Sequence, residues 1–229
     1  MDMQRVVRRK KTEELVDAAV FFQRLSGIDV ANVPSKYGNS VEVARQLVCA
    51  GTEINLVWQY TDVLSIDTGR VELAGGAALT GKMPPRVLQD CKQVLCYVIT
   101  LGGFEKLNSD DAIATYFFDT WGSAYVECAQ AWLADYVRRE LAQEGLERTH
   151  LWSPGQHQFE LENQKPLFQL LAPEEIGCTL SNRLMMIPVK SVSGIMGVVE
   201  AGRENLLRPC DFCRFKPTCP ASQRGCSVL

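Results

Sequence analysis

Apolar residues recur at helical spacing in two segments near the start of the chain. The first segment covers residues 12–25, and the stretch after it is rich in glycine, proline, serine and asparagine, which predicts turns. A second helix is predicted from Ser40 onward. The apolar faces of these two helices consist of Leu15, Ala18, Ala19 and Phe22, and of Val41, Ala44, Leu47 and Val48.

Strands are predicted in the middle of the chain and near its end. Residues 54–73 are rich in β-branched and aromatic side chains, with a turn signal at Asp67-Thr68-Gly69. The apolar run 94–103 predicts a buried strand that ends in two glycines. Residues 184–192 and 194–201 predict two further strands.

The longest helical pattern covers residues 110–144, and we expect this helix to break or bend near Gly122. Shorter helices are predicted around residues 85–91 and over 164–171. Helices and strands follow one another without regular βαβ alternation, which favours an α+β fold. We therefore predict a mixed or antiparallel central sheet with flanking helices, followed by a small irregular cysteine-rich segment.

Composition and charge exclude several classes of protein. The 229 residues carry a net charge of −3, so broad nucleic-acid binding is not expected. No apolar run is long enough to cross a bilayer. The basic run 5–11 is interpreted as a solvated terminus, and acidic residues interrupt the apolar stretch that follows, unlike in a signal peptide. We therefore expect a cytoplasmic protein with no nucleic-acid or membrane partner.

Cysteines fall into two groups. Five are scattered singly among apolar neighbours, as expected for buried thiols in a reducing compartment. The other four crowd the last twenty residues with the spacing C-x2-C-x5-C-x6-C, and they are Cys210, Cys213, Cys219 and Cys226.

Four thiolates at this spacing predict a metal site. A 4Fe–4S cluster is favoured by the irregular spacing and by Pro220 directly after the third cysteine. Structural zinc is the alternative, although zinc sites more often use two C-x-x-C pairs, and free redox-sensing thiols are a third interpretation. Three basic residues between the cysteines would stabilise an anionic sulfur-rich centre, and they are Arg214, Lys216 and Arg224.

Five motifs together resemble the reactivation domain of cobalamin-dependent methionine synthase and its stand-alone relatives. The resemblance covers about residues 71–198. It implies three parts: residues 1–70 packed on a reactivation-like domain of residues 71–200, and a metal-binding tail of residues 201–229. The motifs are LTGKMPPRVLQDC, VITLGGFEKL, WGSAYVECAQAWLADYVRRE, SPGQHQFELENQKPLFQLL and IGCTLSNRLMMIPVKSVSG.

The family domain binds S-adenosylmethionine beside a corrinoid and helps to return cob(II)alamin to methylcobalamin with an electron from a separate donor. By this resemblance Glu127 corresponds to a helix glutamate that contacts S-adenosylmethionine, and Ser153 and Gly155 match the family's ligand loop. Gln156 and Leu151 stand where the pattern has a tyrosine and an arginine. Loss of the guanidinium removes a carboxylate anchor and puts S-adenosylmethionine binding in doubt.

Two functions remain open from the sequence. The first is a reductive activator of a corrinoid-dependent methyltransferase, with the cysteine tail passing the electron and residues around Glu127 and 153–156 forming a ligand or docking cleft. Its partners would be the corrinoid protein and an electron donor protein. The second is a non-catalytic binding module with a structural zinc tail and a decayed S-adenosylmethionine site. No nucleophile and general-base pair indicates a self-contained methyltransferase.

Overall fold

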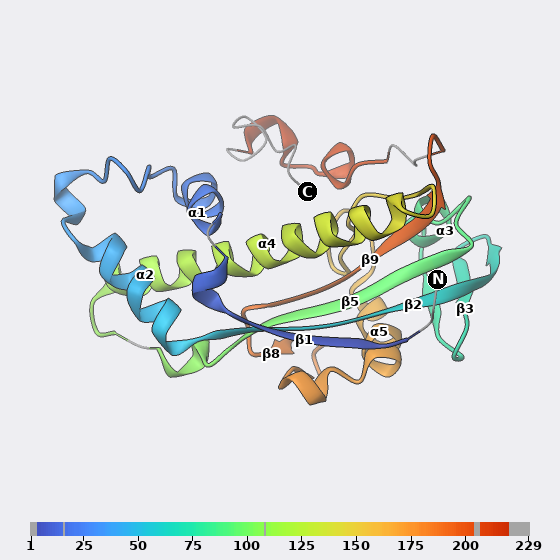
Figure 1. The fold of residues 1–229 in the computed structure, drawn as a ribbon, viewed down its shortest axis with the longest axis horizontal. Coiled ribbons are helices and arrows are strands. Elements are labelled where there is room, and N and C mark those ends of the chain that lie inside the picture. Colours follow the sequence, from blue (N-terminus) through green and yellow to red (C-terminus); the bar gives the residue numbers. More distant parts are fainter. Residues whose placement is uncertain (1–3, 16, 108, 204–206, 220–229) are drawn as a thin grey trace.

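A seven-stranded antiparallel sheet forms the middle layer of the molecule (Figure 1). The structure, a computed structural model, describes residues 4–15, 17–107, 109–203 and 207–219. The strand order is β4-β3-β2-β5-β9-β6, and β1 pairs with β2. The strands of this sheet are β1 (Val6–Lys11), β2 (Glu53–Asp67), β3 (Arg70–Leu73), β4 (Ala78–Thr80), β5 (Gln93–Gly102), β6 (Leu146–Arg148) and β9 (Ser191–Glu200). A separate small hairpin consists of β7 (Thr179–Leu180) and β8 (Met186–Ile187).

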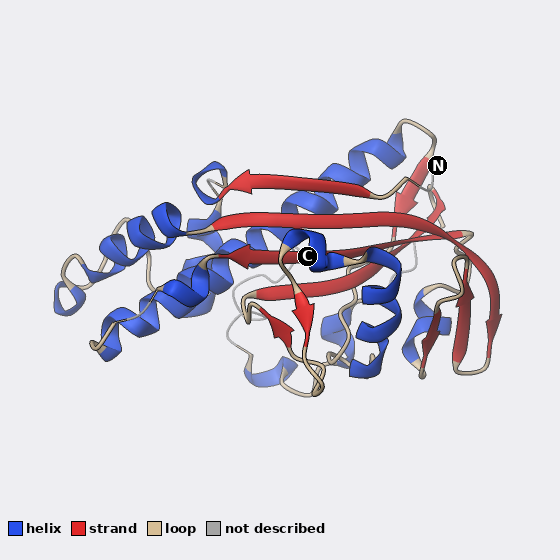
Figure 2. Cartoon of the chain, turned by 90° about the horizontal axis from the view of Figure 1, so that it is seen from below, coloured by secondary structure: helices blue, strands red, loops and turns tan. Residues whose placement is uncertain are grey.

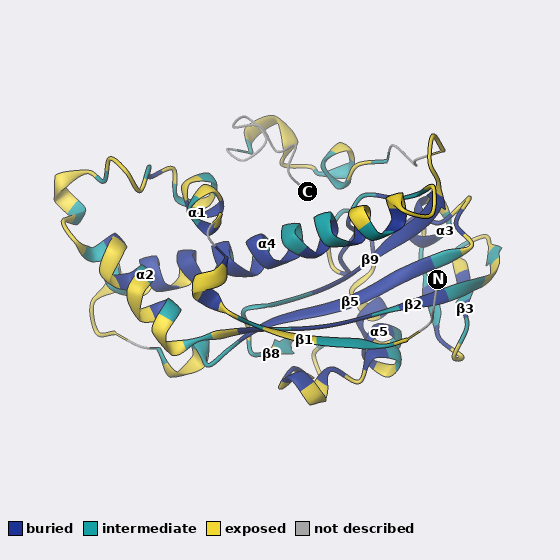
Figure 3. Cartoon of the chain, viewed as in Figure 1, coloured by how far each residue is buried: buried dark blue, intermediate teal, exposed yellow. Residues whose placement is uncertain are grey.

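Helices pack on both faces of the sheet (Figure 2). The 31-residue helix α4 shares one apolar cluster with α1 and α2, whereas α3 and α5 contribute to the cluster on the other face. The buried side of α4 is continuous along its length (Figure 3). The predicted α+β class with an antiparallel central sheet is therefore confirmed. The helices are α1 (Ala18–Ser26), α2 (Ser40–Gly51), α3 (Met83–Val87), α4 (Ala112–Ala142) and α5 (Gln164–Leu171).

Strand β5 explains why its sequence is apolar at almost every position. Successive side chains of a strand point to opposite faces. Leu95 and Tyr97 belong to the cluster under α4, whereas Val94 and Cys96 belong to the cluster beside α5. Because both faces are covered, neither parity of the strand needs polar residues.

The N-terminal segment differs from its prediction. The basic run is strand β1 rather than a solvated terminus, because its backbone pairs with β2 and the Arg8 guanidinium lies 4.6 Å from the ring centroid of Tyr136. The helix predicted over residues 12–25 divides into a 3-10 turn at Thr12–Glu14 and α1. The division of the chain into parts at residues 70 and 200 stays a prediction.

Two predicted interruptions are wrong for the same reason. Helix α4 continues through Gly122, where a Cβ atom would lie only 2.5 Å from Cε2 of Phe104, so this glycine admits a ring and does not break the helix. Residues 191–200 form one strand that continues through Gly194, which faces Tyr97 on β5. Each glycine provides room for an aromatic side chain from another element.

Among the described residues, no helix combines the length and the apolar character that crossing a membrane requires. The tail is irregular, as predicted, with two 3-10 turns at Pro209–Phe212 and Lys216–Thr218.

Candidate functional site

A pocket of about 310 Å³ lies between α4, the loop after Trp152 and the start of β9, and we call it the α4 pocket. Three of the four predicted ligand residues line it: Glu127, Ser153 and Gln156. The fourth, Gly155, lies in the same loop, where its N–H donates to the Phe159 carbonyl at 2.7 Å. The complete lining is Ser123, Val126, Glu127, Gln130, Ser153, Gln156, Val189, Lys190, Ser191 and Val192.

The loop is fixed to the edge of the sheet. Trp152 and Ile195 exchange two backbone hydrogen bonds of 3.1 and 2.9 Å, which places Ser153 directly after an anchored residue. Ser153 is itself buried. The position of the loop therefore depends on β9 and not on the loop's own residues.

Tyr97 joins this loop to α4. Gln130 donates to the Tyr97 hydroxyl at 2.6 Å, and Ser153 is also hydrogen-bonded to it. Burial raises the pKa of Tyr97 to about 12, although the bonds to Gln130 and Ser153 oppose this rise. The phenol is therefore neutral at ordinary pH and serves as a fixed hydrogen-bonding centre beneath the pocket. Gly194 faces it across the strand pair and leaves room for the ring.

The Glu127 carboxylate is paired with Arg24, which reaches it from α1. The Arg24 side chain is 11% exposed and the Glu127 side chain 30%. Arg24 also lies over the ring of Phe21, with its guanidinium carbon 4.8 Å from the ring centroid. A positively charged ligand group at Glu127 would therefore compete with a cation supplied by the chain itself.

Lys190 supplies a cation at another part of the wall. Its Nζ atom lies 2.6 Å from Oδ1 of Asp119 and donates to the Ser123 hydroxyl at 2.9 Å. The Lys190 side chain is 12% exposed, whereas that of Asp119 is 68% exposed. The α4 pocket thus contains one carboxylate and one ammonium group, as a zwitterionic ligand would require.

Leu151 stands where the family pattern has an arginine, and it is buried in the cluster under α4. It cannot provide a cation to the pocket, so Lys190 is the lining residue that could bind a ligand carboxylate. Sequence reasoning missed Lys190 and Gln130. Lys190 carries no periodic signal in its irregular segment, and Gln130 looks like an ordinary polar position of a long helix.

The four-cysteine prediction is only partly within the described residues. Cys210, Cys213 and Cys219 are half-buried, and Cys226 lies outside the described ranges. In residues 4–15, 17–107, 109–203 and 207–219, no three histidine, cysteine, aspartate or glutamate side chains are grouped closely enough to hold a metal ion. The metal site stays a prediction.

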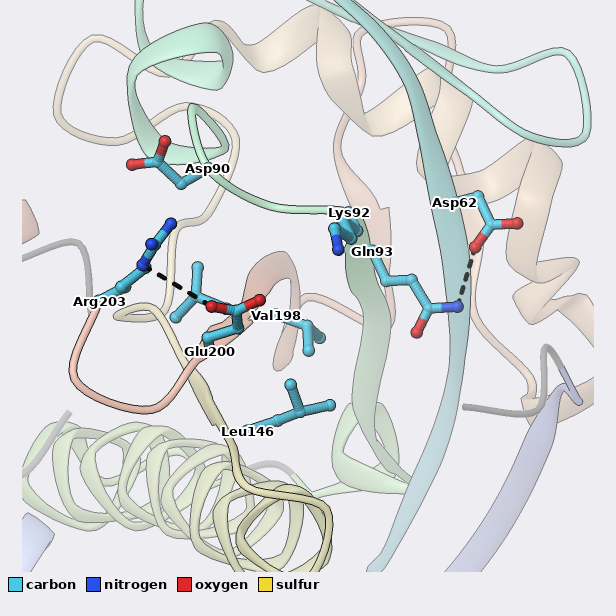
Figure 4. Close-up of a pocket in the computed structure, with 9 residues that line it drawn as sticks. Asp62, Asp90, Lys92, Gln93, Leu146, Val198, Glu200 and Arg203 are labelled. Atoms are coloured by element: carbon cyan, nitrogen blue, oxygen red, sulfur yellow. Dashed lines mark hydrogen bonds and ion pairs between the residues drawn. The ribbon is translucent and has the colours of Figure 1, made fainter.

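A larger pocket of about 410 Å³ lies at the opposite end of β9 (Figure 4). Its charged and amide groups pair with one another: Gln93 donates to Asp62 at 2.8 Å, and Arg203 lies 3.7 Å from Glu200. It contains none of the residues that the sequence analysis selected. The α4 pocket is therefore the better candidate.

Comparison with known proteins gives a match in structure and none in sequence. No family model and no curated protein matches the chain. The solved structure of the MetH reactivation domain bound to AdoHcy superposes with a TM-score of 0.58 at 15% sequence identity. The match covers 85% of this chain and 78% of that domain. The resemblance predicted from sequence motifs is thus confirmed for the fold, and this chain has a reactivation-domain-like fold.

Proposed function

We propose that this protein is an accessory protein of cobalamin-dependent methyl transfer that binds an S-adenosylmethionine-like ligand in the α4 pocket. One observation carries the proposal. Glu127, Ser153 and Gln156, selected from the sequence, meet at one pocket in a chain whose fold resembles a domain solved with AdoHcy.

The pocket chemistry suits the amino-acid end of such a ligand. Glu127 would bind the ammonium group once Arg24 is displaced, and Lys190 would bind the carboxylate. The amides of Gln130 and Gln156 can donate and accept hydrogen bonds to hydroxyl groups or ring nitrogens. The pocket volume of about 310 Å³ is at the lower end for ligand sites, so the ligand would fill it.

An apolar surface beside the pocket suits a protein partner. Every second side chain from Met185 to Val189 is large, apolar and exposed: Met185 by 57%, Ile187 by 53% and Val189 by 64%. Val189 also lines the pocket. Exposed apolar groups gathered beside a polar pocket are typical of interaction sites. We propose that a corrinoid-carrying protein docks here, with its corrinoid facing the α4 pocket.

The finer proposal concerns the electron. Cys210, Cys213, Cys219 and Cys226 would hold a 4Fe–4S cluster, with zinc as the alternative. The cluster would pass one electron, received from a separate low-potential donor protein, to cob(II)alamin on the partner. The reduced cobalt would then take the methyl group from the sulfonium of S-adenosylmethionine and release S-adenosylhomocysteine. Side chains of this chain bind and orient the methyl donor, and the corrinoid stays with the partner.

The alternative is a non-catalytic binding module with structural zinc. It is favoured by the burial of Leu151 and by the ion pair that occupies Glu127. Under this alternative the tail stabilises the fold and carries no electron.

The two proposals predict different results with protein purified without oxygen. The first predicts iron and sulfide at about four each per chain. It also predicts that the reduced protein converts cob(II)alamin on the corrinoid-binding part of a methionine synthase to methylcobalamin only when S-adenosylmethionine is present. Zinc at about one per chain, together with an unchanged cobalamin spectrum, would reject the electron role. Failure of AdoHcy to bind in calorimetry would reject the ligand site.

A further inference from the structure

Phe212 in the cysteine tail packs against the body of the protein. Its ring centroid lies 5.8 Å from that of Trp152, and the Arg86 guanidinium carbon lies 5.0 Å from the Phe212 ring centroid on another side. Phe212 is half-buried and packs against the cluster beside α5. Phe215, three residues later, is 58% exposed and contacts Arg214 of the tail itself. The two tail phenylalanines therefore have different environments.

The turn that carries Phe212 also presents the C-x-x-C pair. The Cys213 N–H donates to the Cys210 carbonyl at 3.3 Å, which closes the 3-10 turn Pro209–Phe212. Residues i and i+3 of a 3-10 turn eclipse, so both cysteines lie on the same side of this turn. Phe212 lies between them in sequence and contacts the domain.

An ion pair joins this turn to the next one. Lys216 Nζ lies 2.7 Å from Oδ1 of Asp211. Asp211 and, more weakly, the nearby Cys210 raise the pKa of Lys216. The ammonium group therefore lies near a cysteine of the predicted site, where it would stabilise a thiolate or an anionic cluster.

Trp152 links the tail contact to the α4 pocket. Its side chain is 1% exposed, its backbone is bonded to Ile195, and the next residue, Ser153, lines the pocket. Figure 1 shows the tail outside the layers, on the side of the sheet where β9 lies. The tail therefore docks on the segment that leads into the pocket wall.

We propose that Phe212 is a positioning residue that docks the C-x-x-C turn on Trp152, so that the tail's metal site serves the α4 pocket of its own chain. This inference rests on the proposed function for the metal's role, whereas the docking contact itself does not. A tail that acted on a different molecule would have no need for an aromatic contact beside this pocket. Phe215 provides a matched control, because it is the same residue type without the contact to the domain.

Docking is tested by hydrogen–deuterium exchange of residues 207–219 in the anaerobically purified protein and in the variants Phe212→Ala and Phe215→Ala. Loss of the half-buried aromatic contact should speed exchange in this segment about tenfold for Phe212→Ala. Phe215→Ala should match the wild type. Phe212→Tyr keeps the ring and should restore slow exchange. Equal exchange in the two alanine variants would overturn the docking role.

The role in electron delivery is tested with the same variants. Metal content should be unchanged in all of them, and Phe212→Ala should reduce cob(II)alamin about tenfold more slowly than Phe215→Ala. An unchanged rate with intact metal would overturn the positioning role even where docking is lost. If the wild type holds no iron or does not reduce cob(II)alamin, the proposed electron role fails, and with it the role of Phe212 in electron delivery. The exchange measurement then still decides whether Phe212 docks the tail.

Discussion

Arg24 on α1 and Glu127 on α4 form an ion pair at the edge of the α4 pocket. The two residues are 103 positions apart in sequence, and the pair places a guanidinium where the resemblance implies a ligand's positive group. Any cationic ligand group that binds Glu127 has to exchange with Arg24. The affinity of the pocket therefore depends on a residue outside it.

Replacing Arg24 by Met should increase ligand affinity. The apolar part of the side chain is kept over Phe21, while Glu127 loses its internal partner. We expect AdoHcy to bind about tenfold more tightly by calorimetry, because the ligand no longer displaces a cation. Stability should fall by about 1 kcal/mol, since the carboxylate is partly exposed. Arg45→Met, which breaks an exposed pair with Glu42 on α2, is the control and should leave affinity unchanged. Weaker binding by Arg24→Met would show that Arg24 belongs to the ligand site.

Replacing Lys190 by Met should weaken binding of the amino-acid end of a ligand only. The ammonium group is the cation that lines the pocket, and Asp119, its partner, is largely exposed, so the fold should tolerate the change. AdoHcy affinity should fall about tenfold to a hundredfold, as expected for loss of a charge-assisted hydrogen bond. Adenosine, which lacks the amino-acid group, should bind the variant and the wild type equally. A parallel loss for both ligands would contradict a contact to the carboxylate.

Much of the fold was predictable from local pattern, and the errors have a common cause. Strand β5 and helices α2 and α5 were found because their apolar residues follow one period. The continuity of α4 was missed because Gly122 was taken as a break, whereas Phe104 from a distant turn packs against it. Strands β4 and β6 have three residues each, too few to show a period.

The site was predictable only where a motif carried it. Glu127, Ser153 and Gln156 came from the family resemblance, and the structure brings them to one pocket. Arg24 and Lys190 lie in segments without such a motif, and only tertiary packing brings them to α4. Pairings over such sequence separations leave no local pattern in a single sequence.

Gly194→Ala should destabilise the protein and open the loop that lines the pocket. A Cβ atom at this position would lie 2.6 Å from Cζ of Tyr97 and 2.7 Å from the Trp152 carbonyl oxygen, and neither can move freely. We expect a loss of about 2–3 kcal/mol in the free energy of unfolding, measured with urea. Gly51→Ala is the control, because its Cβ would meet only the end of the Leu107 side chain at 3.0 Å. Its cost should stay below about 1 kcal/mol. Similar costs for both variants would contradict the constraint at Tyr97.

Stability should fall as the pH rises above about 9. Burial raises the pKa of Cys91, Cys96 and Cys128 to about 12 in the folded protein, whereas an unfolded thiol titrates near about 8.5. Between these values the unfolded state binds fewer protons, so the free energy of unfolding decreases with pH by about 1 kcal/mol per thiol and pH unit. Below about 8 the contribution is fully present. Urea unfolding from pH 7 to 10.5 measures the slope, and Cys96→Ala should reduce it. The same slope in Cys96→Ala and wild type would contradict this cause.

Alkylation should separate the two groups of cysteines once metal has been removed. The thiolate is the reactive species, and thiols with a pKa of about 12 are almost entirely protonated at pH 8. Iodoacetamide should therefore modify the half-buried Cys210, Cys213 and Cys219 and leave Cys91 and Cys96 unmodified, as peptide mass spectrometry would show. Protein kept with its metal should be protected in the tail if those thiols are ligands, because coordinated sulfur is a poor nucleophile. Equal tail modification with and without metal removal would contradict the metal site, and rapid modification of Cys96 in the folded protein would contradict its burial.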